Sequence, residues 1–480
     1  MSKKKSKSEG IYFTGESSND VTGSQYFVRF GEYQCLLECG LHQSKSNDYL
    51  DSYKVNSAKF KFKPTEISYV FVAHGHIDHC GLLPRLVKEG FNGDIITTEK
   101  TARIMKPLLL NSSYIVEDEA RVLSKRYNRE YPPLYTEADV YKTLSQIRVY
   151  DEYDTIFKLN EVISFQWLAN SHCLGAAQLQ LILESDMKKR KILYTSDIGS
   201  LQSKNHFLEN TEIPTFFNDV VIMESTYGDP SRITKKTRKF DADHLRTAIT
   251  TTIQRGGTAI IPCFSFSRTQ EILSTLFDLF GWDDEFKTPI IVDSKLSCEI
   301  SDLYHELLTG EDNEYWKRLC SWKNLRFISE KEDSKLCIAD NAPKVVISSS
   351  GFCTNGRIIN YLKKYIKDRN SMVIFSGYTG DSPSYLSYRI KNYREHKTIS
   401  INKEKVENRA DCITLSTFSS HADHNDLIKY GSSLRTNKLV LVHGAKESKM
   451  QLADKLKDAI SRNDHTYKVL VSNKDMVVHL

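Results

Sequence analysis

The sequence predicts an α/β protein in which one α/β domain is inserted into another, and two features of the chain support this prediction. In residues 1–228, apolar runs typical of buried strands recur, and several of them end at a His, Asp or Glu side chain. In residues 229–400, strands alternate with helices, which is typical of a compact domain with a largely parallel sheet. Ligand-type residues return in residues 401–480, so we expect this segment to complete the first domain.

The composition is that of an ordinary globular protein with more than one domain. Of the 480 residues, 40% are hydrophobic and 26% are charged, and the formal net charge is +5. This mild charge does not by itself predict a polyanionic partner. No apolar run approaches the roughly 20 residues that a membrane-spanning helix needs, so we expect no membrane association.

The ten cysteines are scattered along the chain, and none of them forms a CxxC pair. Most lie in apolar segments, as reduced core residues do. This usage favours a reducing compartment, so we expect the protein in the cytoplasm, or in the nucleus if the organism is eukaryotic.

The densest group of ligand-type side chains follows the apolar run of residues 67–73. His74, His76, Asp78 and His79 lie within six residues, and a segment with helical spacing comes after them. Because neutral imidazoles and a carboxylate suit zinc, this turn between a strand and a helix is a predicted metal site. The alternative interpretation is a polar turn whose histidines cap the helix, but four such side chains are difficult to accommodate there without an ion.

Further predicted strands deliver one ligand-type side chain each at their carboxyl ends. A single such residue is more often structural, but the repetition predicts that the strand ends meet at one site. The residues concerned are Glu38, His172, Asp197, Glu224, His421 and His443.

These motifs resemble the metallo-β-lactamase superfamily and, within it, the β-CASP nucleic-acid hydrolases. The resemblance runs along nearly the whole chain, and it is greatest to the RNA-processing branch, which includes the endonuclease of the pre-mRNA 3′-end cleavage factor and its prokaryotic relatives. The most specific segments are His74-x-His76-x-Asp78-His79, Ser171-His172-Cys173-Leu174-Gly175, Ser196-Asp197, Met223-Glu224-Ser225-Thr226-Tyr227-Gly228, Phe418-Ser-Ser-His421 and Val442-His443-Gly444.

The resemblance implies a fold and a metal content. The fold is an αββα metallo-β-lactamase sandwich with an inserted α/β β-CASP domain, and the cofactor is a pair of zinc ions. By similarity, one zinc is held by His74, His76 and His172, the other by Asp78, His79 and His443, and Asp197 bridges the two.

The resemblance also implies the catalytic side chains, which are Asp78, Glu224 and His421. His421 is expected to be the general acid, oriented by Glu224. DNA-directed β-CASP enzymes typically lack a histidine at the last motif, so His443 favours RNA as the substrate.

Hydrolysis of a phosphodiester is the chemistry that these residues suit. Two zinc ions about 3.5–4 Å apart share a hydroxide, made from water whose pKa falls to roughly 7, which attacks phosphorus. A histidine outside the metal ligands, with a carboxylate to raise its pKa, then protonates the leaving sugar oxygen, which is the role expected of His421. His424 is a weaker candidate for this role, because we expect it at an exposed helix start.

Two segments depart from the family pattern. The first motif normally contains Asp, and Glu38 stands in its place. Its added methylene lengthens a side chain that is expected to contact a metal-bound histidine from outside the metal shell. The family's Gly-Tyr-x-x-x-Gly-Thr stretch appears here as residues 377–384, which we expect to line the substrate cleft.

Cationic and aromatic side chains of the inserted domain are candidates for substrate binding. Such residues neutralise phosphates and stack on bases, although each cluster alone is more often a solvated face. The candidates are Arg232, Lys235, Lys236, Tyr378 and Arg389.

The sequence therefore predicts a zinc-dependent ribonuclease. Two alternatives stay open: a zinc hydrolase that acts on DNA or a small ester, and a non-catalytic scaffold of the same fold. All seven predicted ligand positions are filled, which argues against the scaffold. The expected partners are RNA and proteins that target the enzyme, while the mode of cleavage (endonucleolytic or from the 5′ end), the RNA target and the oligomeric state are not predicted.

Overall fold

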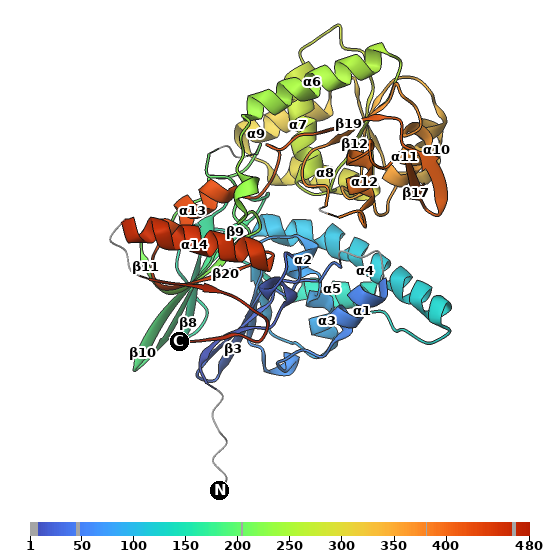
Figure 1. The fold of residues 1–480 in the computed structure, drawn as a ribbon. Helices are drawn as coiled ribbons and strands as arrows, with labels where there is room; N and C mark the ends of the chain where they lie inside the picture. The colour runs from blue at the N-terminus through green and yellow to red at the C-terminus, as the bar shows by residue number, and fades with distance from the viewer. Residues whose placement is uncertain (1–7, 45–48, 203–204, 381, 463–466) are drawn as a thin grey trace.

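The computed structural model describes residues 8–44, 49–202, 205–380, 382–462 and 467–480. Two bodies are visible in Figure 1. One contains the first half of the chain together with its C-terminal segment, and the other contains the segment between them. This arrangement is the expected insertion of one α/β domain into another.

The first body contains two seven-stranded sheets with parallel and antiparallel pairs. In the first sheet the strand order is β22-β1-β2-β3-β4-β5-β6, and in the second it is β21-β20-β11-β10-β9-β8-β7. The first sheet consists of β1 (Gly10–Phe13), β2 (Tyr26–Phe30), β3 (Tyr33–Leu37), β4 (Tyr69–Phe71), β5 (Asp94–Thr97), β6 (Ile147–Val149) and β22 (Val477–His479). The second consists of β7 (Phe157–Lys158), β8 (Ile163–Ala169), β9 (Ala177–Ser185), β10 (Lys188–Tyr194), β11 (Phe217–Glu224), β20 (Arg435–Val442) and β21 (Lys468–Val471).

The two sheets pack face to face, and helices cover their outer faces. Val28 and Phe71 of the first sheet share one buried cluster with Trp167 and Ile222 of the second. The outer face of the first sheet is covered by α2 (Ile77–Cys80), α3 (Leu83–Lys88), α4 (Glu99–Tyr127) and α5 (Glu137–Ser145), and α1 (Tyr49–Ser57) packs against α4. The outer face of the second sheet is covered by α13 (His424–Ser432) and α14 (Lys446–Arg462). The predicted αββα sandwich is confirmed.

The inserted body is a parallel sheet flanked by helices, as the alternating sequence pattern predicts. Its strand order is β14-β13-β15-β12-β16-β19. The strands are β12 (Ala259–Pro262), β13 (Ile290–Asp293), β14 (Leu325–Ile328), β15 (Val345–Ser348), β16 (Met372–Phe375) and β19 (Asp411–Thr414), with a hairpin of β17 (Thr398–Ile401) and β18 (Glu404–Glu407). The helices are α6 (Arg238–Gln254), α7 (Arg268–Phe280), α8 (Lys295–Leu307), α9 (Gly310–Cys320), α10 (Lys331–Ala339), α11 (Ile358–Tyr365) and α12 (Leu386–Lys391).

The sheet of the inserted body continues beyond residue 400. β19 pairs in parallel with β16, with Met372 opposite Asp411. The division of the chain at residues 228 and 400 stays a prediction, and this pairing favours a later second boundary.

Side-chain caps fix where several helices begin. Thr98, Thr237, Ser294 and Asp423 precede α4, α6, α8 and α13, and the side chain of each accepts a backbone N–H of the first turn. These oxygens satisfy N–H groups that have no partner within the helix. The cap at Asp423 also fixes the end of the loop that carries His421.

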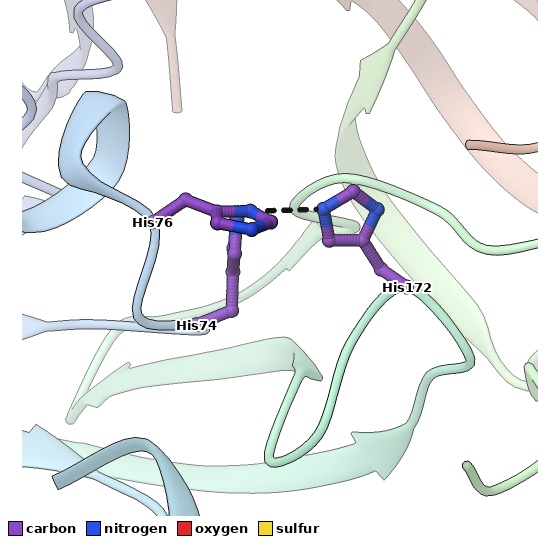
Figure 2. Close-up of side chains that lie close together, drawn as sticks. All are labelled: His74, His76 and His172. Carbon is purple, nitrogen blue, oxygen red and sulfur yellow. Dashed lines mark hydrogen bonds between the residues drawn. The ribbon is translucent and has the colours of Figure 1, made fainter. Parts of the chain in front are cut away.

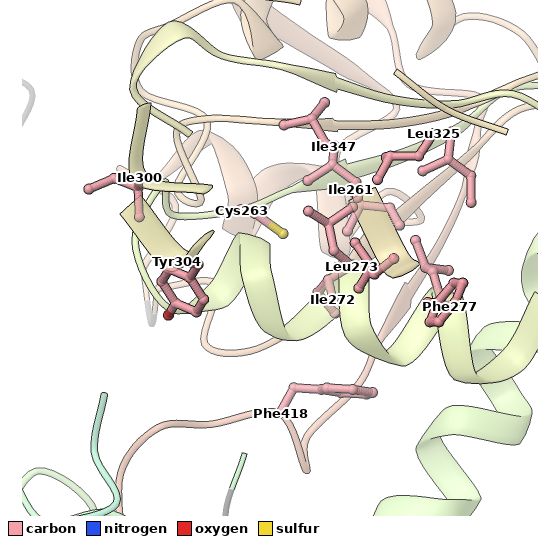
Figure 3. Packing of buried hydrophobic residues seen from close by; sticks show 14 of the residues in the cluster. Ile261, Cys263, Ile272, Leu273, Phe277, Ile300, Tyr304, Leu325, Ile347 and Phe418 are labelled. Carbon is pink, nitrogen blue, oxygen red and sulfur yellow. The ribbon is translucent and has the colours of Figure 1, made fainter. Parts of the chain in front are cut away.

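The two bodies share one apolar core. Ile104 and Leu174 of the first body belong to the same buried cluster as Ile272 and Phe277 of the inserted one. Figure 3 shows Phe418, in the segment that returns to the first body, lying beside α7 of the inserted body. Because one apolar cluster joins the two bodies, we expect little motion of one body relative to the other.

The longest helix, α4, has 29 residues and carries charged side chains along its length. Among the described residues, no helix is both long and apolar enough to span a membrane.

Candidate metal centre

The ligand-type residues lie on loops at the carboxyl ends of strands from both sheets. His74 and His76 follow β4, Asp197 follows β10, and His443 follows β20. β11 and β20 run in parallel with Glu224 opposite Val442, so the two strands end at the same level. Their residues 220–223 and 439–442 are buried apolar runs, typical of strands covered on both faces. The parallel register therefore brings residues far apart in sequence to one edge.

His74, His76 and His172 form the first group, and Figure 2 shows their rings converging from two loops. Nε2 of His172 lies 3.2 Å from Nδ1 of His76. Nδ1 of His172 donates a hydrogen bond to the carbonyl oxygen of Ser420 at 3.1 Å. A neutral imidazole with its proton on Nδ1 keeps its lone pair on Nε2, so the Nε2 lone pair of His172 points towards His76 and His74.

Asp78, His79 and His443 form the second group. Oδ2 of Asp78 lies 3.5 Å from Nε2 of His443 and 3.8 Å from Nε2 of His79. On its other side, Nδ1 of His79 lies 3.6 Å from Oε1 of Glu38. Glu38 is buried and also accepts the backbone N–H of Ala73, which follows β4, so its carboxylate is fixed beside the His79 ring of α2.

Asp197 lies between the two groups. Its Oδ2 is 3.4 Å from Nε2 of His79 in the second group and 3.7 Å from Nε2 of His172 in the first. Its Oδ1 is 3.2 Å from Nδ1 of His443. A carboxylate in this position can give one oxygen to each of two neighbouring cations.

The chemistry of these side chains fits bound zinc. Burying polar atoms without hydrogen bonds is costly, and a concentration of such atoms in one place is expected where a metal ion binds. The donor set of imidazole nitrogens and carboxylate oxygens is one that zinc prefers. Among the described residues, the buried atoms here without a hydrogen-bond partner include His74 Nε2, His79 Nε2, Asp197 Oδ1 and His443 Nε2.

The protonation states of the three histidines of the first group and of Asp78 suit metal binding. Burial lowers the pKa of His76 to about 4, and burial together with neighbouring imidazoles holds the pKa values of His74 and His172 well below the usual range. These three rings are therefore neutral at pH 7, as histidine ligands must be. Burial raises the pKa of Asp78, but His79 and His443 outweigh it and bring the value to about 2, so this carboxylate is ionised.

His421 and Glu224 lie beside the two groups. Nδ1 of His421 is 3.2 Å from Oε1 of Glu224, whose side chain is buried while that of His421 is 21% exposed. Burial lowers the pKa of His421, but the Glu224 carboxylate outweighs it and raises the value to about 10. His421 is thus protonated at neutral pH, and its ring centroid lies 4.7 Å from that of His172.

The loops around the site hold three non-glycine residues in the left-handed backbone region. They are Glu38, Ser196 and His443, with φ values of 61°, 54° and 50°. This conformation is unfavourable for residues with a Cβ atom, and it clusters at functional sites where the surrounding structure enforces it. Here it directs side chains from strand ends towards the site.

The structure brings most of the predicted site residues together. The seven candidate metal ligands, Glu38, Glu224 and His421 all lie at this edge. Arg232 and Tyr378 also meet, because the Arg232 guanidinium lies 4.8 Å from the Tyr378 ring centroid. Within the described residues, no hydrogen bond, ion pair or ring contact links Lys235, Lys236 or Arg389 to the groups, so their role stays a prediction.

The structure differs from the sequence predictions in the burial of His424 and in two hydroxyl groups that contact the histidines of the site. His424 is buried instead of exposed, and its Nδ1 donates to the Gly228 carbonyl at 2.9 Å, because α13 packs against the segment that follows β11. Ser196 and Thr226 were not among the predicted site residues, yet their hydroxyls lie 3.0 Å from Nδ1 of His74 and of His443. Both lie within motifs quoted above, Ser196-Asp197 and Met223–Gly228, and this position is the signal that identifies them.

Three protein-family models match separate parts of the chain. The metallo-beta-lactamase superfamily model matches residues 19–148, the Beta-Casp domain model matches residues 269–383, and the model of the Zn-dependent metallo-hydrolase RNA specificity domain matches residues 405–469. The first match contains the His74–His79 motif, and the third contains His421 and His443.

Proteins named as ribonucleases or as a transcription termination factor are similar over most of this chain. Ribonuclease TTHA0252 of Thermus thermophilus is 28% identical, over 91% of this chain and 93% of that protein. Transcription termination factor FttA of Methanocaldococcus jannaschii is 25% identical, over 92% of this chain and 68% of that protein. Endoribonuclease YSH1 of Eremothecium gossypii is also 25% identical over 90% of this chain, which spans only 54% of that longer protein.

A solved structure shares the fold. The crystal structure of a protein of unknown function from Enterococcus faecalis V583 superposes with a TM-score of 0.55, covers 99% of this chain and is 14% identical.

The sandwich and its cluster of His and Asp residues are those of a metallo-hydrolase of the metallo-β-lactamase superfamily. Within that superfamily, the chain belongs to the β-CASP RNA-processing nucleases.

Proposed function

We propose that this protein is a zinc-dependent ribonuclease that hydrolyses phosphodiester bonds of RNA. The observation that carries the proposal is the position of Asp197, 3.4 Å from His79 and 3.7 Å from His172, between two groups of ligand-type side chains. This arrangement is suited to a pair of cations that act together on one phosphate.

The proposed zinc ligands are the two groups described above. His74, His76 and His172 would hold one ion, Asp78, His79 and His443 the other, and Asp197 both. When bound, the ions supply Lewis-acid stabilisation of negative charge and lower the pKa of a water molecule that acts as nucleophile. Ser196, Ser420 and Thr226 contact the remaining ring nitrogens of three of these histidines and so orient the imidazoles.

His421 is the proposed general acid. Its Nδ1 faces Glu224, so Nε2 is the nitrogen from which a proton can pass to the leaving sugar oxygen. Glu224 accepts backbone N–H groups from Ile198 and Thr226, and these bonds hold its carboxylate against the His421 ring. Glu224 is therefore a positioning residue that also keeps His421 protonated.

RNA is the substrate that we favour over DNA or a small ester. The supporting observations are the match of residues 405–469 to an RNA specificity domain and the ribonuclease names of similar proteins. The scaffold alternative is disfavoured, because a chain without catalysis has no need to keep seven ligand-type side chains together. We further propose that partner proteins select the RNA, and that the ten unpaired cysteines reflect a cytoplasmic or nuclear location.

A comparison of substrates tests the proposed function. We expect the purified protein with zinc to cleave single-stranded RNA faster than single-stranded DNA of the same sequence, and to lose this activity when a chelator is added. We expect His76→Ala to abolish cleavage, whereas His396→Ala, which alters a histidine of the inserted domain outside the groups, should cleave normally. Unimpaired cleavage by the His76→Ala protein would contradict the proposal.

A further inference from the structure

A row of aromatic rings runs along the edge of the inserted domain next to the metal centre. The rings belong to Tyr227, which follows β11, and to three residues that follow the parallel strands β16, β15 and β12, namely Tyr378, Phe352 and Phe264. Together with Arg232 we call them the aromatic ladder. Because carboxyl ends of parallel strands are where open α/β sheets bind ligands, this position favours a binding site.

Each member of the aromatic ladder contacts the next. The Arg232 guanidinium lies between two rings, 5.3 Å from the Tyr227 centroid and 4.8 Å from the Tyr378 centroid. The Phe352 centroid is 6.1 Å from that of Tyr378 and 5.3 Å from that of Phe264, and both ring pairs are edge to face. The ladder is therefore continuous.

One end of the aromatic ladder contacts the candidate metal centre, and the loop at its other end also reaches it. The Tyr227 centroid lies 5.6 Å from that of His421, the proposed general acid. At the other end, Phe264 shares a loop with Phe266, whose ring centroid lies 5.2 Å from that of His76. A molecule bound along the ladder is thus within reach of the phosphate position at the metal centre.

The aromatic ladder is partly open to solvent, unlike the core rings. Phe264 is 47% exposed and Tyr378 is 36% exposed. The Phe264 ring lies over Gly351, where an added Cβ would approach it to 3.1 Å, so glycine leaves the space that this ring occupies. Water solvates exposed aromatic rings poorly, so a group of them on the surface indicates a ligand-binding or interaction site.

The combination of a cation with aromatic rings in the ladder indicates a ligand that carries both negative charge and bases. No carboxylate among the described residues pairs with Arg232 within 4.0 Å, so its charge is available to a phosphate. Rings interleaved with a cation are the means by which proteins hold single strands, since bases stack on the rings and the cation neutralises the backbone. Recognition of RNA also relies on unstacked bases that reach aromatic side chains.

We propose that the aromatic ladder binds single-stranded RNA next to the scissile phosphate, with bases stacked on Phe264 and Tyr378 and a phosphate held by Arg232. The inference rests on the proposed function for its substrate. It adds that the enzyme requires unpaired bases beside the cleavage site, and that the phosphodiester alone is a poor substrate. A duplex that keeps these bases stacked is excluded from the ladder.

The test separates base stacking from chemistry. In Phe264→Ala, we expect the KM for single-stranded RNA to rise about 10-fold, the effect of losing one stacked base, with kcat little changed. The zinc content of the Phe264→Ala protein should equal that of the wild type. Phe264→Tyr keeps a ring and should restore the KM, while Trp282→Ala, which removes another exposed ring of the inserted domain, should behave as wild type.

Abasic nucleotides provide the second arm. A series of RNAs carries one abasic site each, at successive positions. We expect the abasic site beside the cleaved bond to raise the KM of the wild-type protein, but to have little further effect in Phe264→Ala. An unchanged KM in Phe264→Ala, with no sensitivity to abasic sites at any position, would overturn the inference.

Binding distinguishes failure of this inference from failure of the proposed function. We expect a fluorescent single-stranded RNA to bind the His421→Ala protein, in which cleavage is slow, about 10-fold more tightly than a His421→Ala, Phe264→Ala protein. Normal RNA cleavage without this difference in binding contradicts the inference that the aromatic ladder binds RNA, and leaves the proposed function intact. The binding difference without cleavage by the wild-type protein supports the ladder and contradicts the proposed function.

Discussion

Nδ1 of His421 lies 3.2 Å from Oε1 of Glu224, and the Glu224 carboxylate is buried while the His421 ring is partly open to solvent. The pair joins segments 197 residues apart in the sequence. It forms because β11 and the loop before α13 end at the same edge of the second sheet. The contact gives His421 both an orientation and a charge, and each can be tested separately.

Replacing Glu224 by Gln should shift the pH dependence of RNA cleavage. A general acid works only while it is protonated, so activity is lost as the pH rises through the pKa of His421. Glu224 raises that pKa, and removal of its charge therefore moves the alkaline limb to lower pH, by about 1–3 units. Bound cations lower the pKa in both proteins, so the difference between the two kcat profiles is the measurement. Superimposable alkaline limbs would show that Glu224 does not act through His421.

Removal of His421 should affect substrates according to their leaving groups. With RNA, His421→Ala is expected to lower kcat about 10²- to 10⁴-fold, because the sugar oxygen leaves poorly without a proton. With bis(p-nitrophenyl) phosphate the leaving group is stable as an anion, so the variant should retain most of its activity. Zinc content measured on the same preparation should equal that of the wild type. An equal loss with both substrates would argue against general acid catalysis by this residue.

Glu38 should tune zinc affinity from outside the ligand groups. Its Oε1 lies 3.6 Å from Nδ1 of His79, on the side of the ring opposite Asp78. Glu38→Gln keeps the shape but removes the charge, and we expect zinc to bind about 10- to 100-fold more weakly in a chelator competition. Glu38→Asp should fall between Gln and wild type, because the shorter side chain recedes from the ring. Equal affinities in all three proteins would show that Glu38 does not support His79.

Phe418 should stabilise the contact between the two bodies. Its side chain is fully buried in their shared core, and the Arg238 guanidinium lies 4.0 Å from its ring centroid. Phe418→Ala is expected to lower the free energy of unfolding by about 3–5 kcal/mol, measured by denaturant titration. Tyr114→Ala on α4 is the control, because its exposed side chain should contribute less than about 0.5 kcal/mol. A Phe418→Ala protein as stable as the control would contradict the shared core.

Local motifs, together with their resemblance to a known family, were sufficient to predict the fold class and the residues that gather at the site. The His74–His79 motif, for example, adjoins the apolar run that becomes β4, and such a run reveals both a strand and its end. Contacts that depend on packing were not predictable in this way. His424 begins α13 as expected, but its burial depends on the distant Gly228 carbonyl.

The aromatic ladder illustrates the same limit. Tyr378 and Arg232 were recognised as separate candidates, 146 positions apart, from local composition. Arg232 follows β11 and Tyr378 follows β16, and these strands belong to different sheets, so their contact depends on how the two bodies pack together. Phe264 and Phe352 are not among the binding residues predicted from the sequence, since a single Phe after a strand is more often part of a core.

The central claim, that two groups of side chains hold two cations with Asp197 between them, is tested most directly by counting zinc. Elemental analysis of the purified wild-type protein, saturated with zinc and then freed of excess, should give two ions per chain. His443→Ala, which removes a ligand from the second group alone, should retain about one. A wild-type protein that binds no zinc, or a His443→Ala protein that still binds two, would contradict the account.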